Sequence, residues 1–195
     1  MKLLMHLCCS NCALYPLKSL LSRDIGVKGF WFNPNIHPHP EYQNRLDSLQ
    51  RLERLWGFDI EYHDRYRPDE FLRTIGDPRD NRCIRCYGMR LEETARTARA
   101  MGLDGFTTSL LVSPYQQFDE IVRVGVEMAR KHSIPFLYED FRIGYKDSIP
   151  LSRELGLYRQ KYCGCLYSER ERQERKKKNF TAEIAEAAET TEENL

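Results

Sequence analysis

The sequence predicts a single α/β domain with a mostly parallel sheet flanked by helices. The first observation is that short apolar runs alternate with longer segments in which leucines recur at helical spacing. Such alternation is typical of strand–helix–strand units, whose strands pair in parallel. The second is the composition, because 195 residues with 41% hydrophobic and 30% charged side chains suit one ordinary globular domain. The formal net charge of +1 gives no overall indication of a nucleic-acid partner.

Five expected strands are short apolar runs bounded by turn formers. Residues 2–7 open the chain as a buried strand, and residues 27–32 end at the proline-rich loop of residues 33–40. The remaining strands are expected at residues 59–62, 105–111 and 135–138. Runs of about four to eight apolar residues between turn formers are typical of buried strands.

Four expected helices alternate with these strands. Each repeats apolar residues at three- and four-residue spacing. They cover residues 12–23, 41–56, 88–101 and 117–132. Residues 65–80 are expected to form a loop that contains a short helix. Residues 168–195 are strongly charged, and we expect them to form a helical or frayed tail outside the domain of residues 1–167.

Six of the seven cysteines form three close pairs, Cys8–Cys9, Cys83–Cys86 and Cys163–Cys165. The first residues are too short for a signal peptide, and no apolar run approaches the roughly 20 residues of a membrane span. We therefore expect a cytoplasmic chain without a membrane partner. In that compartment paired cysteines are typical of metal or catalytic sites rather than structural disulfides.

Cys8, Cys9, Cys83 and Cys86 are the candidate metal ligands. Cys8 and Cys9 follow the first strand, where the start of a helix favours thiolates and where parallel sheets bind ligands. Cys83 and Cys86 can chelate the same group, and a loop before them disfavours a thioredoxin-like motif. Four thiolates suit a [4Fe–4S] cluster, which we favour, or a zinc ion. We expect Cys12, one turn into the helix, to be a buried core residue.

Cys163 and Cys165, on either side of Gly164, are too close to bind one iron comfortably. Their expected Cα separation of roughly 5.5–7 Å lies in the range of a disulfide. Gly164 permits the unusual backbone that such a small ring requires. Small strained disulfides are easily reduced and are often catalytic, so we expect this pair to be redox-active.

Several motifs in the same order resemble the epoxyqueuosine reductases of the QueH type, the cobalamin-independent class. The resemblance spans about residues 1–167. Its motifs begin with Leu7-Cys8-Cys9-Ser10-Asn11-Cys12 and Phe32-Asn33-Pro34-Asn35-Ile36-His37-Pro38. They continue through residues 82–87, 90–95, 106–114 and 139–141, and end at residues 155–165 with Tyr162-Cys163-Gly164-Cys165.

The resemblance implies the last step of queuosine synthesis, in which the epoxide of epoxyqueuosine in tRNA is reduced to an alkene. It implies cluster ligation by Cys8, Cys9, Cys83 and Cys86 and a redox-active pair at residues 163 and 165. The implied fold is the Rossmann-like sheet of the adenine-nucleotide hydrolase (HUP) superfamily. No Gly/Ser-rich phosphate loop follows the first strand, which disfavours ATP binding.

Epoxide removal also needs a proton donor and a source of electrons. Asp140, Tyr115 and His37 lie in expected strand-end segments, and we take Asp140 as the working candidate. No flavin or nicotinamide fingerprint is visible, so an external electron donor is expected, and a further iron beside the cluster is left open. The alternatives are a cluster-free thiol–disulfide oxidoreductase and a zinc-stabilised RNA-binding module. The iron, sulfide and zinc contents of the protein distinguish these three.

Overall fold

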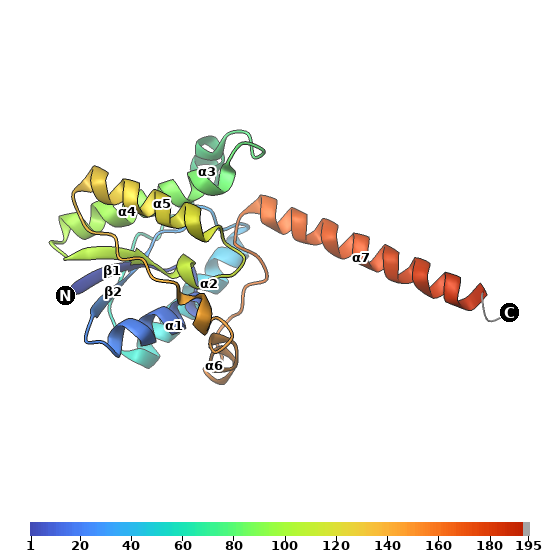
Figure 1. The fold of residues 1–195 in the computed structure, drawn as a ribbon, viewed down its shortest axis with the longest axis horizontal. Coiled ribbons are helices and arrows are strands. Elements are labelled where there is room, and N and C mark those ends of the chain that lie inside the picture. The colour runs from blue at the N-terminus through green and yellow to red at the C-terminus, as the bar shows by residue number, and fades with distance from the viewer. Residues whose placement is uncertain (193–195) are drawn as a thin grey trace.

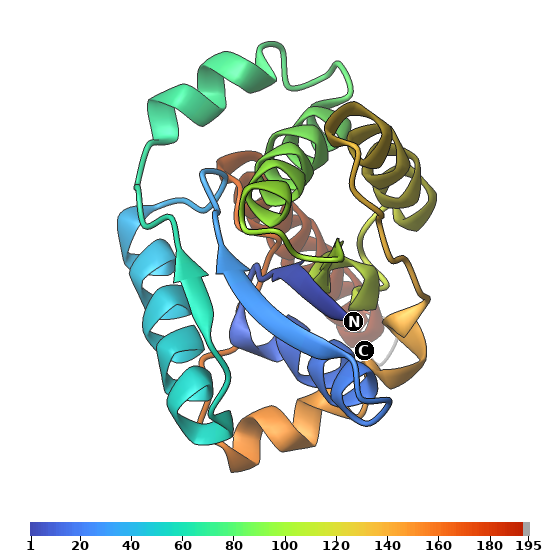
Figure 2. The ribbon, with the colours of Figure 1, turned by 90° about the vertical axis from the view of Figure 1, so that its left-hand side faces the viewer.

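The computed structural model describes residues 1–192, and a four-stranded sheet lies at its centre (Figures 1 and 2). The strands are β1 (Lys2–His6), β2 (Gly26–Trp31), β3 (Ile60–Tyr62) and β4 (Gly105–Thr108). They are all parallel, in the order β3-β2-β1-β4. In this register Met5 of the central strand faces Gly29 on one side and Thr107 on the other. The predicted parallel α/β architecture is confirmed.

Helices cover both faces of the sheet (Figure 2). One face carries α1 (Ser10–Leu21) and α2 (His39–Trp56), and the other carries α4 (Arg82–Ala100) and α5 (Phe118–His132). This cover explains why β1 is an almost unbroken apolar run, since a strand buried on both faces has no solvent side. The connecting elements are α3 (Pro68–Ile75), η1 (Ser109–Val112), η2 (Phe141–Gly144) and α6 (Ser148–Glu154).

The structure corrects two of the expected strands. The strand expected at residues 105–111 stops at Thr108, whose hydroxyl accepts a hydrogen bond from Leu110 N (3.2 Å) and starts the 3-10 turn η1. Residues 135–138 make a single parallel bridge, in which Phe136 pairs with Phe106. The hydrogen bonds that join the two segments, from Phe106 N to the Pro135 carbonyl oxygen and from Leu137 N to the Phe106 carbonyl oxygen, both involve Phe106, so the pairing is a bridge and not a fifth strand.

The Cys83–Cys86 segment belongs to α4 itself, which begins at Arg82 rather than near Gly88. A glycine inside a helix costs about 1 kcal/mol, which favours a boundary there. Burial of Tyr87 and Arg90 on the same turn outweighs that cost. The two cysteines are therefore held by helical backbone and not by a loop.

A long helix, α7 (Leu166–Glu192), leaves the domain and extends away from it (Figure 1). This helix begins two residues before the charged segment of residues 168–195, of which residues 193–195 lie outside the described part of the chain. At its start, Tyr167 packs against a small apolar cluster formed by Phe71, Ile75 and Cys165, the residue directly before the helix. None of the helices in the part of the chain that the structure describes is long and apolar enough to cross a membrane.

Candidate active site

One cavity of about 760 Å³ opens where β1, β4, the start of α4 and the start of α7 meet. Five cysteines line it: Cys8, Cys12, Cys83, Cys163 and Cys165. Leu110, Ser113 and Tyr115 line it from the segment after β4. The carboxyl ends of the central strands thus surround a cavity, as expected for a parallel sheet.

Cys8, Cys9 and Cys12 form a buried group of three thiols at the β1–α1 junction. Their sulfur atoms all lie within 4.8 Å of one another. Cys9 is the N-cap of α1 and accepts a hydrogen bond from Cys12 N (3.3 Å), which brings the third sulfur back toward the strand end. Hydrogen bonds from the thiols of Cys12 and Cys9 hold the pKa of Cys8 well below its usual value. Cys12 is buried as expected, and its sulfur is also part of the site.

Cys83, in the first turn of α4, lines the same cavity, whereas Cys86, one turn further on, lies behind the lining against the cluster of Phe71, Ile75 and Cys165. Burial raises the pKa of the Cys83 thiol and raises that of Cys86 to about 11. Arg90, only 3% exposed, donates through Nε to the Cys86 carbonyl oxygen (3.2 Å). Its positive charge acts on both Cys86 and Cys8. A buried cation is therefore close enough to both groups of thiols to offset thiolate charge.

The sulfur atoms of Cys163 and Cys165 lie 3.7 Å apart on the opposite wall. Hydrogen bonding from the Cys165 thiol, burial in the opposite sense and the Ser168 hydroxyl 2.9 Å away together lower the pKa of Cys163 to about 5. The pKa of Cys165 rises because its thiol donates this hydrogen bond to Cys163, and burial and the charge of Cys163 act in the same direction. Gly164 between them has φ +119°, a conformation that side chains disfavour. The pair is thus arranged as one thiolate beside one thiol.

Arg45 of α2 fixes the backbone of this Cys163–Cys165 segment by hydrogen bonds. Its side chain is 1% exposed, and it pairs with Glu41 at 2.7 Å. It donates to the carbonyl oxygens of Tyr162 (2.9 Å) and Cys163 (3.1 Å). The sequence analysis missed this residue, although an arginine four residues after Glu41 and next to Leu46 and Leu49 on the inward face of a helix was a usable signal.

The loop after β2 supports the cysteine pair and does not line the cavity. His37 N donates to the Gly164 carbonyl oxygen (2.8 Å), and the Tyr162 hydroxyl donates to the His37 carbonyl oxygen. A side chain at position 164 would meet Ile36 at 3.0 Å, so the glycine is required by space as well as by backbone angle. This loop therefore reaches the site only through the Cys163–Cys165 segment that it supports.

The three candidate proton donors lie in different surroundings. Asp140 is outside the cavity lining and forms an ion pair with Arg142 (2.6 Å), which lowers its pKa. His37 is buried against Phe71, and burial lowers its pKa. Tyr115 lines the cavity and is 81% exposed, with its ring against that of Tyr145. Of the three, only Tyr115 faces the cysteines' cavity.

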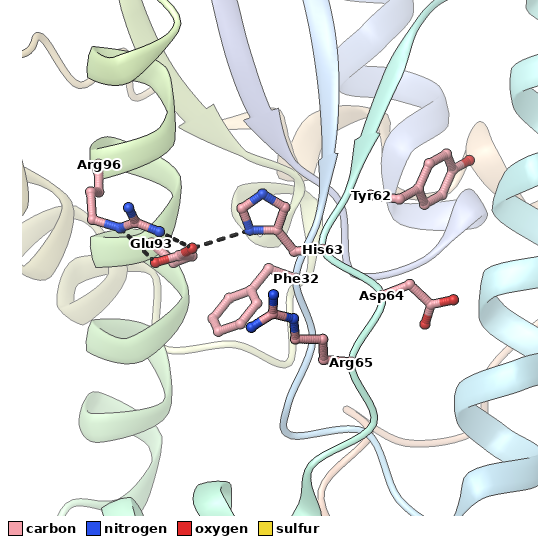
Figure 3. A pocket seen from close by; sticks show the side chains of 7 residues that line it. All are labelled: Phe32, Tyr62, His63, Asp64, Arg65, Glu93 and Arg96. Atoms are coloured by element: carbon pink, nitrogen blue, oxygen red, sulfur yellow. Dashed lines mark hydrogen bonds and ion pairs between the residues drawn. The ribbon is translucent and has the colours of Figure 1, made fainter.

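A second cavity, of about 320 Å³, lies between the end of β3 and the middle of α4 (Figure 3). Glu93 is its centre, bound to His63 Nδ1 at 3.1 Å and to Arg96 at 2.6 Å. The remaining lining residues are Phe32, Tyr62, Asp64 and Arg65. No cysteine lines it, and Glu93 is already paired with His63 and Arg96. The thiol chemistry therefore belongs to the larger cavity.

A comparison with protein families matches residues 3–171 to the family described as "Epoxyqueuosine reductase QueH". This match covers all seven cysteines and the whole α/β domain. The chain belongs to the QueH family. The resemblance inferred from the motifs is thereby confirmed. The family is named for a reductase, and a reductase is an oxidoreductase.

Individual QueH relatives align over most of the chain. The protein named epoxyqueuosine reductase QueH from Dehalococcoides mccartyi is 39% identical over 171 residues, 88% of this chain and 94% of its own. The protein of the same name from Thermotoga maritima is 33% identical over 88% of this chain and 92% of its own. That from Haemophilus influenzae is 33% identical over 87% of this chain and 72% of its own.

Proposed function

We propose that this protein removes the epoxide oxygen of epoxyqueuosine in tRNA to give queuosine, the last step of queuosine biosynthesis. The observation that carries the proposal is one cavity lined by five cysteines, in a chain that matches the QueH family over residues 3–171. Reduction of an epoxide to an alkene consumes two electrons and two protons and releases water. The cavity must therefore supply both electrons and protons.

The thiols fit an iron–sulfur cluster by their chemistry and their surroundings. Cys8 and Cys9 lie in a group of sulfurs within 4.8 Å of one another, and buried Arg90 offsets charge between Cys8 and Cys86. We propose Cys8, Cys9, Cys83 and Cys86 as ligands of a [4Fe–4S] cluster. Such a cluster would supply electrons one at a time. Because four cysteines would occupy all four irons, a Lewis acid for the epoxide oxygen would have to be a further iron beside the cluster.

The Cys163–Cys165 pair can supply both electrons of the reaction and one of its two protons. Cys163, with its pKa near 5, is already a thiolate at neutral pH, while Cys165 keeps its proton. Oxidation of this thiolate and thiol to one disulfide releases two electrons and one proton, so the second proton that epoxide removal consumes must come from another donor, such as the Tyr115 hydroxyl in the cavity wall or water. Bond formation requires the sulfurs to close from 3.7 Å to about 2.05 Å. An external donor then returns the pair to the dithiol.

The remaining candidate groups for orienting the substrate and donating a proton are two tyrosines and Asp140. Tyr115 and Tyr145 share a wall of the cavity and can hold or orient a planar base or donate a proton. Asp140 remains a candidate donor only if the segment around η2 turns toward the cavity when substrate binds. The roles of Tyr115 and Asp140 are thus separable by mutation.

The test is an anaerobic reaction of reduced protein with tRNA that bears epoxyqueuosine, followed by nucleoside mass analysis. The expected product has lost one oxygen atom. If cluster-replete, reducible protein leaves the epoxide intact with every reasonable donor, the assignment fails. Zinc without sulfide would instead favour the RNA-binding module, and absence of any metal the cluster-free thiol enzyme.

Serine variants test the ligands separately from the reaction. Cys8→Ser, Cys9→Ser, Cys83→Ser and Cys86→Ser should each lower the iron and sulfide content of the purified protein and abolish epoxide reduction. Cys12→Ser is the informative comparison, because its sulfur lies in the same group as Cys8 and Cys9. Full cluster content in three or more of the four ligand variants would contradict the proposed set.

A further inference from the structure

The first half of α7 carries a basic face that continues from the cavity out along the helix. Residues 169–178 contain six basic residues, three acidic residues and no apolar residue. A helix that is polar all round does not bury a face against another protein layer. This segment therefore extends from the domain for a reason other than apolar packing (Figure 1).

One side of α7 belongs to the cavity wall. The cavity-lining residues of the helix are Ser168, Glu171, Arg172, Arg175, Lys176 and Asn179. With 3.6 residues per turn, these positions fall on a single face that runs for about 16 Å. We call Arg172, Arg175 and Lys176 the basic stripe. The opposite face carries Arg170 and Lys177, so the two faces can be changed independently.

The charge of the stripe is not used within the protein. In the described part of α7 the ion pairs are Glu171 with Arg82 (2.5 Å) and Arg170 with Glu174 (2.8 Å), and neither includes a stripe residue. Glu171 is thereby neutralised by Arg82 beside the cysteines. The one acidic residue on the cavity face thus does not cancel the stripe.

Two guanidinium groups in the cavity wall also have unused donors. Nε of Arg172 and Nε of Arg82 are both buried and have no hydrogen-bond partner among the described residues. Arg172 is placed by the ring of Tyr162 (5.9 Å), next to Cys163. A buried donor without a partner is costly, and an anionic ligand entering the cavity would satisfy both.

The start of the helix is fastened firmly enough to present these cations in fixed positions. Ser168 N donates to Cys165 Sγ (3.4 Å), and the Arg82 guanidinium lies over the ring of Tyr167 (5.8 Å). The stripe is therefore tied to the cysteine pair by the same first turn that carries Ser168. A ligand held by the stripe is also held in register with the thiols.

We propose that the basic stripe of α7 binds the phosphate backbone of an RNA strand whose modified nucleotide occupies the cavity. The inference rests on the proposed function, because that function places an RNA nucleotide among the cysteines. A nucleotide within a polynucleotide continues into flanking phosphates, and a row of cations leading out of the cavity is complementary to them. The family match ends at residue 171, so the stripe is a feature of this chain beyond that match.

The test compares Arg175→Gln/Lys176→Gln with Arg170→Gln/Lys177→Gln, which removes two cations from the opposite face of the same helix. The probe is labelled tRNA without the modification, so binding is read without chemistry. The stripe variant should bind about 20-fold more weakly at about 0.15 M salt, and its slope of log K against log salt should be smaller by about 1.4–1.8. The opposite-face variant should stay within about 2-fold of the wild type.

Controls separate a lost contact from a lost fold. Far-ultraviolet circular dichroism and iron content should match the wild type in both double variants. Arg175→Lys/Lys176→Arg, which keeps both charges, should keep the affinity. Equal weakening in both glutamine variants, or weakening in neither, would overturn the inference.

Two further outcomes distinguish the proposed RNA contact from a membrane-binding role and from the proposed reaction. If the stripe variant loses binding to vesicles of anionic phospholipid and not to tRNA, the stripe serves a membrane surface and the inference is wrong. If the wild type leaves the epoxide intact while the stripe variant loses affinity for tRNA, the proposed reaction fails and the RNA contact stands.

Discussion

Replacing the buried guanidinium behind the cysteine pair should destabilise the whole site. In Arg45→Met the carboxylate of Glu41, 9% exposed, loses the cation that pairs with it at 2.7 Å. Removal of one partner from a buried ion pair typically costs about 3–5 kcal/mol, since the other charge stays buried. The carbonyl oxygens of Tyr162 and Cys163 also lose their donors. With a slope of about 2 kcal/mol per molar urea, the unfolding midpoint should fall by about 2 M.

A matched variant on the same helix makes the reasoning testable. Arg51→Met removes an exposed arginine that also donates to a backbone carbonyl, that of Leu155 at 3.0 Å. Its expected cost is only about 0.5–1.5 kcal/mol. Adding Glu41→Gln to Arg45→Met removes the uncompensated charge, so the loss should shrink to about 2–3 kcal/mol from the two carbonyl oxygens. Equal midpoints for the two single variants, or no recovery in the double variant, would refute this account.

The same variant has a readout that general destabilisation does not move. The charge of Arg45 is one of the causes that lower the pKa of Cys163, so its loss should raise that pKa above about 5. The pH profile of Cys163 alkylation, measured in urea-free solution, reports this shift. An unchanged profile would show that Arg45 supports the fold without acting on the thiolate.

Three other predictions follow from single contacts. Alkylation of Cys163 in metal-free, reduced protein should have its midpoint near pH 5, with the reactive thiolate present above it, and Ser168→Ala should move the midpoint upward; a midpoint near 9 would contradict the thiolate assignment. Gly144→Ala should cost about 1–3 kcal/mol in urea unfolding, because the new Cβ would lie 1.9 Å from Tyr15, and a neutral result would show that the ring moves aside. Asp140→Asn tests the proton donor, and an unchanged single-turnover rate of epoxide loss would exclude that carboxylate.

The spacing of apolar residues along the sequence predicted much of the fold. The apolar run of residues 2–7 and the leucine spacing of residues 41–56 predicted a strand and a helix that the structure contains with nearly the same bounds. These patterns are predictive because each helix or strand buries one face, and the spacing of apolar residues along that face follows the repeat of the helix or strand itself. The sites at the ends of the strands were predictable for the same reason, since a parallel sheet places those ends at one edge.

The errors lie where pairing partners decide the conformation. Residues 135–138 have the composition of a strand, yet Phe136 finds only Phe106 to pair with. Residues 109–111 are as apolar as the strand before them, but the hydroxyl of Thr108 caps a 3-10 turn there. Whether an apolar run pairs or turns depends on the neighbouring segment, which lies elsewhere in the chain.

The sequence by itself determined the α/β class, the three cysteine pairs and the family to which the chain belongs. Only the tertiary structure showed that the sulfur of Cys12 lies with those of Cys8 and Cys9 and that Arg45 donates a hydrogen bond to the Cys163 carbonyl oxygen. It alone also showed that residues of α7 line the cavity. The spacing of apolar residues indicates which face of one helix or strand is buried. The contacts above join elements that lie far apart in the sequence, so that spacing does not predict them. Their geometry depends on how the helices and the last loop pack around the sheet, and no short stretch of residues specifies that packing.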